Sequence, residues 1–203
     1  MTHERQGLTP EDLKKEWSLK APQPVIGFYG ETNEFGEFSN FFQHTHTFTI
    51  PEWCGTKRGI CIDVEFSEKS IMLCKASLFD DNEAFEKIKV ATTPHKAKML
   101  GRTVKNFNEH IWSQYVCDIA FQAVYQKFKS NPSLIKVLLS TDSYLIAEAA
   151  PRDRLWGIGM NAYDKRLKVP RQWNGYNVLG HALMKTRKVL LENTCNQVTS
   201  IGL

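Results

Sequence analysis

Two acidic residues stand where a catalytic acid or base could be held. Glu68 follows Ser67 at the point where the alternating apolar stretch 60–66 gives way to a helical pattern. Ser67 is typical of a helix N-cap, and a helix N-terminus favours an ionised carboxylate by about 0.3–1 kcal/mol. An ionised, well-held carboxylate suits a reaction with a cationic transition state. The structural alternative is a first-turn Glu that only complements the helix dipole.

The second carboxylate, Asp153, lies in an irregular stretch, 150–159, that also holds an aromatic residue and two glycines. Trp156 offers a flat face to a base or a sugar, and Gly157 and Gly159 let the backbone approach a ligand closely. Because Gly-x-Gly lacks a third glycine, it is no dinucleotide-binding fingerprint. We expect a ligand-binding segment here.

Four further candidates lie at the end of a predicted strand, 25–29, and in the polar loop that follows it. They are Phe28, Tyr29, Ser39 and Asn40. Small polar residues between aromatics suit a loop that holds a ligand, and equally an ordinary turn packed on aromatic rings.

Two cationic residues could hold phosphate groups. Arg102 follows a predicted helix and could bind in a bidentate manner, whereas Lys75 would act as a point charge. The alternatives are a charge at a helix C-terminus for Arg102 and a solvated helix face for Lys75. The mild net charge of +4 fits an anionic ligand but does not by itself predict nucleic-acid binding.

The sequence predicts neither a metal site nor a cofactor. His44 and His46 share one strand face, but an isolated His-x-His is weak evidence for a metal. The five cysteines are odd in number and include no Cys-x-x-Cys, which favours reduced thiols in a reducing compartment. The polar N-terminus has no signal-peptide core, and no apolar run approaches the roughly 20 residues of a membrane span. We therefore expect a cytoplasmic protein, or a nuclear one in a eukaryote, with no membrane partner.

The pattern of apolar residues predicts an α+β fold that is mostly helical, with a small strand element. Strands are expected near 25–29, 47–50, 60–66 and 144–149, with helices between and after them. The longest helix follows Asn108 and presents Trp112, Val116, Ile119 and Ala123 to the core. Asn177 is expected to cap the last helix and is a further candidate for substrate binding. The predicted boundaries are an extension and linker at 1–24, one compact domain at 25–192 and a tail at 193–203; the oligomeric state stays open.

Taken in order and at these separations, a set of short motifs resembles the NADAR (YbiA-like) family over roughly residues 26–192. The residues are Phe28-Tyr29, Phe38-Ser39-Asn40-Phe41, Ser67-Glu68, Lys75, Ala97-Lys98, Gly101-Arg102, Trp112, Lys127-Phe128, Leu138-Leu139, Trp156-Gly157, Gly159, Asn177, Leu179-Gly180, Leu183-Met184 and Arg187.

The resemblance implies a compact domain that hydrolyses N-glycosidic bonds. Known members act on riboflavin-pathway intermediates, or remove ADP-ribose from modified guanine in nucleic acid. The family's catalytic glutamate matches Glu68, and its later Asp and Trp match Asp153 and Trp156. The implied partners are an ADP-ribose-containing or phosphoribosyl substrate, including ADP-ribosylated DNA or RNA. A module that binds ADP-ribose without cleaving it is the alternative from another functional class.

The sequence also departs from the family pattern. The residue after the glutamate is usually His and here is Lys69, while Ile71, Leu73 and Ala120 replace the expected aromatic, glutamine and methionine. We expect these changes to touch the pocket wall, and therefore to bear on the substrate more than on the type of reaction.

Overall fold

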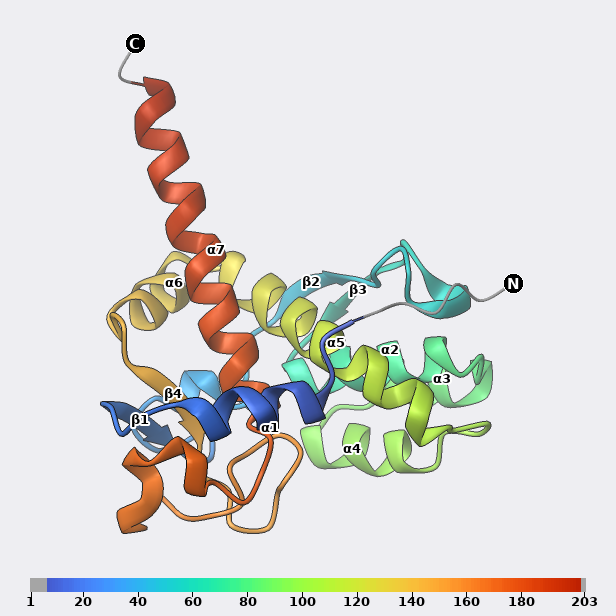
Figure 1. Ribbon diagram of the computed structural model, residues 1–203. Helices are drawn as coiled ribbons and strands as arrows, with labels where there is room; N and C mark the ends of the chain where they lie inside the picture. The colour runs from blue at the N-terminus through green and yellow to red at the C-terminus, as the bar shows by residue number, and fades with distance from the viewer. Residues whose placement is uncertain (1–6, 202–203) are drawn as a thin grey trace.

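A computed structural model describes residues 7–201 and confirms a single, mostly helical α+β domain. Figure 1 shows the helices gathered around α5, with the strands in two separate pairs. The elements in chain order are α1 (Pro10–Leu19), β1 (Val25–Phe28), β2 (His46–Thr49), β3 (Cys61–Val64), α2 (Ser67–Leu78), α3 (Asn82–Lys89), α4 (Pro94–Arg102), α5 (Glu109–Lys129), α6 (Pro132–Leu139), β4 (Leu145–Glu148) and α7 (Val178–Ile201). Short 3-10 turns lie at Gly36–Phe38, Gly55–Lys57, Lys165–Lys168 and Pro170–Gln172.

The two strand pairs differ in direction. β2 and β3 form an antiparallel pair, whereas β1 and β4 are parallel and are far apart in the sequence. Phe28 of β1 lies opposite Glu148 of β4 at the carboxyl ends of both strands. The loops that leave these strands therefore begin side by side, which brings residues near 30 and near 150 together.

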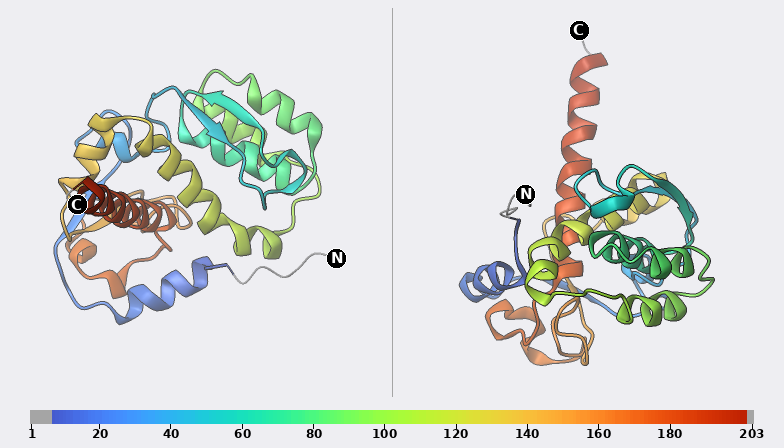
Figure 2. Two further views of the ribbon diagram at one scale, coloured as in Figure 1. Left: turned by 90° about the horizontal axis from the view of Figure 1, so that it is seen from above. Right: turned by 90° about the vertical axis from the view of Figure 1, so that its right-hand side faces the viewer.

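The long helix α5 supplies the centre of the core. Trp112, Val116, Ile119 and Ala123 are all buried, which confirms the predicted stripe. α5 packs against both α7 and α2, and the view from above shows α5 running between α7 and the β2–β3 pair with its helices (Figure 2). Because α2 lies against this rigid centre, the residues of its first turn have a fixed position.

The start of α2 differs from the sequence-based expectation. Phe66 occupies the N-cap position and makes no side-chain cap, while Ser67 is the first helical residue. The hydroxyl oxygen of Ser67 is buried and has no hydrogen-bond partner among the described residues. The N–H of Glu68 instead donates to the backbone carbonyl of Asn40 at 2.9 Å. The turn is thus held by a distant loop, which a local capping pattern could not predict.

The N-terminal helix α1 lies against the body of the domain. Leu13 and Trp17 are fully buried, and the indole N–H of Trp17 donates to the Tyr176 carbonyl at 2.7 Å. The Trp17 ring lies 5.5 Å from that of Trp173. Although residues 1–24 were expected to form an extension, this helix shares its apolar face with the segment before α7. The family pattern begins after it.

The far end of α7 extends beyond the rest of the fold, as Figures 1 and 2 show. The helix continues to Ile201, through most of the predicted tail 193–203. None of the described helices is long and apolar enough to cross a membrane. The four cysteines with described side chains are free, as the odd number without Cys-x-x-Cys predicted, and Cys54, Cys74 and Cys117 are buried. The side chain of Cys195 lies outside the described part.

Candidate active site

A cavity of about 560 Å³ opens where β1 and β4 end, next to α4. Its walls come from the segment after β1, from α4, and from the end of β4 with the loop that follows it. The lining residues are Tyr29, Gly30, Glu31, Thr32, Asn33, Ser39, Phe41, His95, Lys98, Arg102, Glu148, Ala150, Arg152 and Asp153. Of the predicted site residues, the structure therefore brings Tyr29, Ser39, Arg102 and Asp153 together in one lining.

Glu68 lies behind this lining and is almost completely buried, with 3% of its surface exposed. The pKa of its carboxyl group is raised to about 7, chiefly by burial and also by the charge of Asp153, while Lys98 and Arg102 act against this shift. The helix dipole alone would favour the ionised form, so the surroundings outweigh it. At neutral pH Glu68 can hold or release a proton, which is the property of an acid–base catalyst.

Glu148 is a second carboxyl group at the same place, half-buried as a residue, and the sequence analysis missed it. It ends β4 and lines the cavity, yet its Oε2 is inaccessible to solvent and has no hydrogen-bond partner among the described residues. Burial raises its pKa to about 8; the charges of Asp153 and Glu68 act in the same direction, and Lys98 opposes them. The signal in the sequence was a single acid at the end of an otherwise apolar strand.

Asp153 completes a group of three acids but is bound differently. Its Oδ1 accepts the backbone N–H groups of Leu155 and Trp156 at 3.1 and 2.8 Å. Its Oδ2 lies 4.0 Å from the ammonium nitrogen of Lys98. Asp153 therefore fixes the turn that follows Ala150 and holds a cation in the cavity wall.

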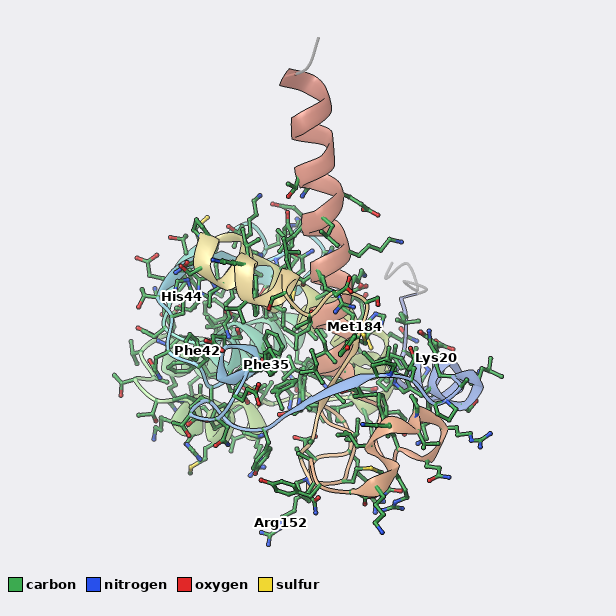
Figure 3. The ribbon with its side chains drawn as sticks, turned by 90° about the vertical axis from the view of Figure 1, so that its left-hand side faces the viewer. Lys20, Phe35, Phe42, His44, Arg152 and Met184 are labelled. Carbon is green, nitrogen blue, oxygen red and sulfur yellow. The ribbon has the colours of Figure 1, made fainter. Side chains whose placement is uncertain are left out.

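Cationic side chains dominate one wall of the cavity. Lys98, Arg102 and His95 come from α4, and Arg152 comes from the loop after β4. Lys98 lies 5.6 Å from the Phe41 ring centre, and the His95 ring meets that of Phe41 edge-on at 5.0 Å. Figure 3 shows Arg152 pointing outward at the edge of the molecule. These groups can bind phosphates while Phe41 and Tyr29 offer flat faces.

The loop that carries Ser39 is fixed from below by a buried lysine. Lys127 of α5 donates to the carbonyl oxygens of Glu37 and Ser39 at 2.7 and 2.9 Å. Burial lowers the pKa of Lys127 to about 7. Asn40 comes next; its carbonyl receives the Glu68 N–H, and its own Oδ1 is buried without a described partner. Lys127 thus connects α5 to both the cavity wall and the first turn of α2.

Asn177 supports the cavity from behind rather than lining it. Its side-chain amide accepts the N–H of Glu148 at 3.1 Å and donates to the carbonyl of Ile146 at 2.9 Å. Gly157 also packs against this strand, since a Cβ at this position would lie only 2.6 Å from the Glu148 carbonyl oxygen. Gly159 has a φ of +68°, which favours glycine. These residues set the position of the strand that ends in Glu148.

The other predicted residues lie outside the lining. Phe28 is buried and meets the Phe38 ring edge-on, and Trp156 packs on the core while its N–H binds Asp153. Lys75 lies over the ring of Phe107, at 4.2 Å, and burial lowers its pKa. None of these three side chains is part of the cavity wall.

The departures from the family pattern do not reach the cavity wall, which corrects the expectation that they would. Lys69, Ile71, Leu73 and Ala120 are buried in α2 and α5 and are absent from the lining. The ammonium group of Lys69 turns to the carboxylate of Glu65 and to the carbonyl of Lys89. These residues lie on helix faces that point into the core.

Sequence reasoning missed Glu148, and it named Lys98 only as part of a motif. Lys98 lies one turn before Arg102 on α4, so their spacing on one helix face was the available signal. Among the described side chains, no group of three His, Cys, Asp or Glu residues could hold a metal ion.

Comparisons with known proteins show which family this chain resembles. The NADAR domain family model matches residues 27–191. N-glycosidase R617 of Acanthamoeba polyphaga mimivirus is 42% identical over 123 residues, which cover 60% of this chain and 72% of that protein. The chloroplastic riboflavin biosynthesis protein PYRR of Zea mays is 31% identical over 174 residues, covering 82% of this chain and 25% of that protein.

A solved structure shares the fold. The NMR structure of the E. coli protein YbiA superposes with a TM-score of 0.65 at 22% identity, covering 87% of this chain and 90% of that one. At this level of sequence identity, the similarity shows a shared fold and nothing about function.

Proposed function

This chain belongs to the NADAR family, and from that premise we propose that it hydrolyses N-glycosidic bonds, specifically the bond between ADP-ribose and a modified guanine base in nucleic acid. The N-glycosidase part rests on relatives that carry that name, such as R617 of the mimivirus. The observation that supports the chemistry in this chain is the buried carboxyl of Glu68 behind a cavity with Lys98 and Arg102 in its wall.

Cleavage of an N-glycosidic bond builds positive charge on the anomeric carbon and negative charge on the leaving nitrogen. In its ionised form, Glu68 stabilises the first charge or takes a proton from the attacking water. Its pKa of about 7 suits that task, because a base that titrates near the working pH is both available and strong enough. Asp153 contributes a fixed negative charge beside Lys98 and can hold a sugar hydroxyl.

ADP-ribose is the proposed group attached to the base, because the basic residues in the cavity wall suit a diphosphate. Arg102 and Arg152 can each bind phosphate oxygens in a bidentate manner, and Lys98 adds a point charge. Tyr29 and Phe41 offer aromatic faces to a base. In this proposal Phe28, Asn40, Trp156, Gly157, Gly159 and Asn177 hold those groups in place. Among the predicted site residues, Lys75 is the least suited to bind substrate, because its ammonium group lies over the Phe107 ring.

A ribosylaminopyrimidine of the riboflavin pathway is the second candidate substrate. The similarity to the maize protein named for riboflavin biosynthesis favours it, although this chain spans 25% of that protein. Such a substrate carries one phosphate, which would occupy fewer of the cations in the cavity wall. The same carboxyl groups would serve both reactions.

The test is to incubate the protein with an oligonucleotide that carries ADP-ribosylated guanine, and separately with a phosphoribosylaminopyrimidine. We expect free ADP-ribose and an unmodified oligonucleotide from the first. Release of the pyrimidine base alone would identify the second candidate instead. Glu68→Gln is the matched control for contaminating activity. If ADP-ribose binds but neither substrate is cleaved, the protein is a binding module and the proposed hydrolysis is wrong.

A further inference from the structure

One oxygen of the Glu148 carboxyl group is unsatisfied although the residue lines the cavity. Its Oε2 is inaccessible to solvent and has no partner among the described residues. Leaving a buried polar atom without a hydrogen bond costs about 1–3 kcal/mol, and folded proteins leave few such atoms. The backbone around it is in contrast fully engaged, since Asn177 receives the Glu148 N–H. Because the half-buried residue also lines the cavity, its carboxyl group borders the space for a ligand while its Oε2 is shielded from water.

The charges around Glu148 come from four elements. The acids are Glu68 at the start of α2 and Asp153 in the loop after β4. The cation whose charge acts on Glu148 is Lys98 of α4. The remaining charged or titratable groups in the cavity lining are Tyr29, Glu31, His95, Arg102 and Arg152. Burial and the two acids outweigh Lys98 and raise the pKa of Glu148 to about 8. At neutral pH the group is mostly a carboxylic acid, so it can donate a hydrogen bond.

We propose that Glu148 is the general acid of this site, which protonates the leaving nitrogen of the base as the N-glycosidic bond breaks. This inference rests on the proposed hydrolysis and adds a second catalytic residue to Glu68. The two carboxyl groups share the same surroundings, and each acts on the charge of the other. Two carboxyl groups at one site can divide the roles of general acid and general base between them, as in glycosidases.

The step balances without any further reactant. The electron pair of the C–N bond goes to the leaving nitrogen, which receives the proton from Glu148. Water attacks the anomeric carbon and gives its proton to Glu68, so that the products are the free base and a sugar with a new hydroxyl. Glu148 is then ionised and Glu68 protonated. Transfer of one proton between these two groups, directly or through solvent, restores the starting state.

Asp153 is less suited to supply that proton. Its Oδ1 already accepts two backbone N–H groups, and its Oδ2 lies 4.0 Å from the Lys98 ammonium nitrogen. These are the partners of a carboxylate rather than of a carboxylic acid. Glu148 has neither kind of partner at Oε2. Asp153 is therefore engaged by backbone donors and a cation, whereas Glu148 keeps one oxygen without a partner among the described residues.

The experiment measures kcat/KM from pH 5 to 10 on an oligonucleotide with ADP-ribosylated guanine, for the wild type, Glu148→Gln and Glu148→Asp. For the wild type we expect a bell-shaped profile whose alkaline limb reports loss of the Glu148 proton. Glu148→Gln should lower kcat/KM by about 10²-fold or more and abolish the alkaline limb. Glu148→Asp, which still carries a proton, should keep measurable activity with a displaced limb. Calorimetry with ADP-ribose should give affinities within a few-fold of the wild type for both variants.

Three results would overturn the assignment. An alkaline limb that survives in Glu148→Gln would show that another group carries the proton. Activity within tenfold of the wild type would make the acid dispensable, and an equally large loss of ADP-ribose affinity would make Glu148 a binding residue. An active wild type with any of these results refutes the role of Glu148 alone, whereas a wild type that cleaves nothing refutes the proposed hydrolysis as well.

Discussion

The side-chain amide of Asn177 accepts the backbone N–H of Glu148 at 3.1 Å, across 29 residues of sequence. The same amide donates to the Ile146 carbonyl at 2.9 Å, so Asn177 pairs with β4 in place of a neighbouring strand. Asn177 itself has a φ of +58°, in the left-handed region. The residue before α7 therefore fixes the position of the β4 backbone from which the Glu148 side chain reaches the cavity.

Replacing Asn177 should loosen this end of β4. Asn177→Ala removes both bonds, leaves two backbone groups of β4 unpaired and keeps a side chain at positive φ, so we expect unfolding to become easier by about 2–4 kcal/mol. Asn177→Gly removes the same bonds without the backbone strain and should cost less. Urea denaturation of both variants measures the difference. Equal stability of Asn177→Gly and the wild type would show that the two bonds contribute nothing.

Glu68→Gln keeps the shape of the side chain and removes its charge. We expect the chemical step to slow by about 10²-fold or more, with little change in ADP-ribose affinity, because the carboxylate acts mainly in the transition state. Single-turnover rates and calorimetry together test this. Near-normal turnover would remove Glu68 from the chemistry, and an unfolded variant would favour the structural role of a first-turn acid.

Asp153→Asn tests whether Asp153 takes part in the reaction or only in substrate binding. The substitution keeps an oxygen that can accept the N–H groups of Leu155 and Trp156, and it removes the charge beside Lys98. If Asp153 holds a sugar hydroxyl, we expect KM to rise more than kcat falls. A loss confined to kcat, like that expected for Glu68→Gln, would instead include Asp153 in the reaction itself.

Glu68 and Glu148 should make the protein less stable as the pH rises. Their pKa values in the folded protein are about 7 for Glu68 and about 8 for Glu148, whereas both ordinarily titrate near 4.5. Between these values the folded state keeps protons that the unfolded state has lost. The free energy of unfolding therefore falls as the pH rises from about 5 to about 8. Urea denaturation at a series of pH values should show this slope.

The double variant Glu68→Gln, Glu148→Gln is the control for that slope. It carries neither titrating group, so its stability should change less across the same pH range and should exceed that of the wild type most clearly near pH 8. An unchanged slope in the double variant would assign the effect to other groups. Lys127 is not among them, because a lysine whose pKa is lowered to about 7 makes the folded protein more stable as the pH rises above 7.

Lys127→Met tests the support beneath the cavity loop. The variant leaves the carbonyl oxygens of Glu37 and Ser39 without their donor, so we expect a loss of about 1–3 kcal/mol in stability and a higher KM as the Ser39 loop loosens. Lys129→Met, on the exposed side of the same helix, is the matched control and should change stability by less than about 0.5 kcal/mol. Equal effects of the two substitutions would refute the special role of Lys127.

Local patterns were enough to predict the elements of this fold. The stripe on α5 specified a helix whose inner face holds Trp112, Val116 and Ile119, because burial follows the helical period directly. The predicted cap at Ser67 was wrong, since Phe66 takes that position and the carbonyl of Asn40 binds the Glu68 N–H. That bond joins a distant loop to α2, and no pattern within a helix can report it.

The sequence by itself determined the helices, the strands, the family and the position of Glu68 at the beginning of a buried helix. Only the tertiary structure decided that Glu68 lies with Glu148 and Lys98, because the parallel pairing of β1 with β4 and the packing of α2 on α4 bring these residues together. It also decided their proton affinities. A carboxyl pKa depends on burial and on neighbouring charges, and both arise from segments that are far apart along the chain.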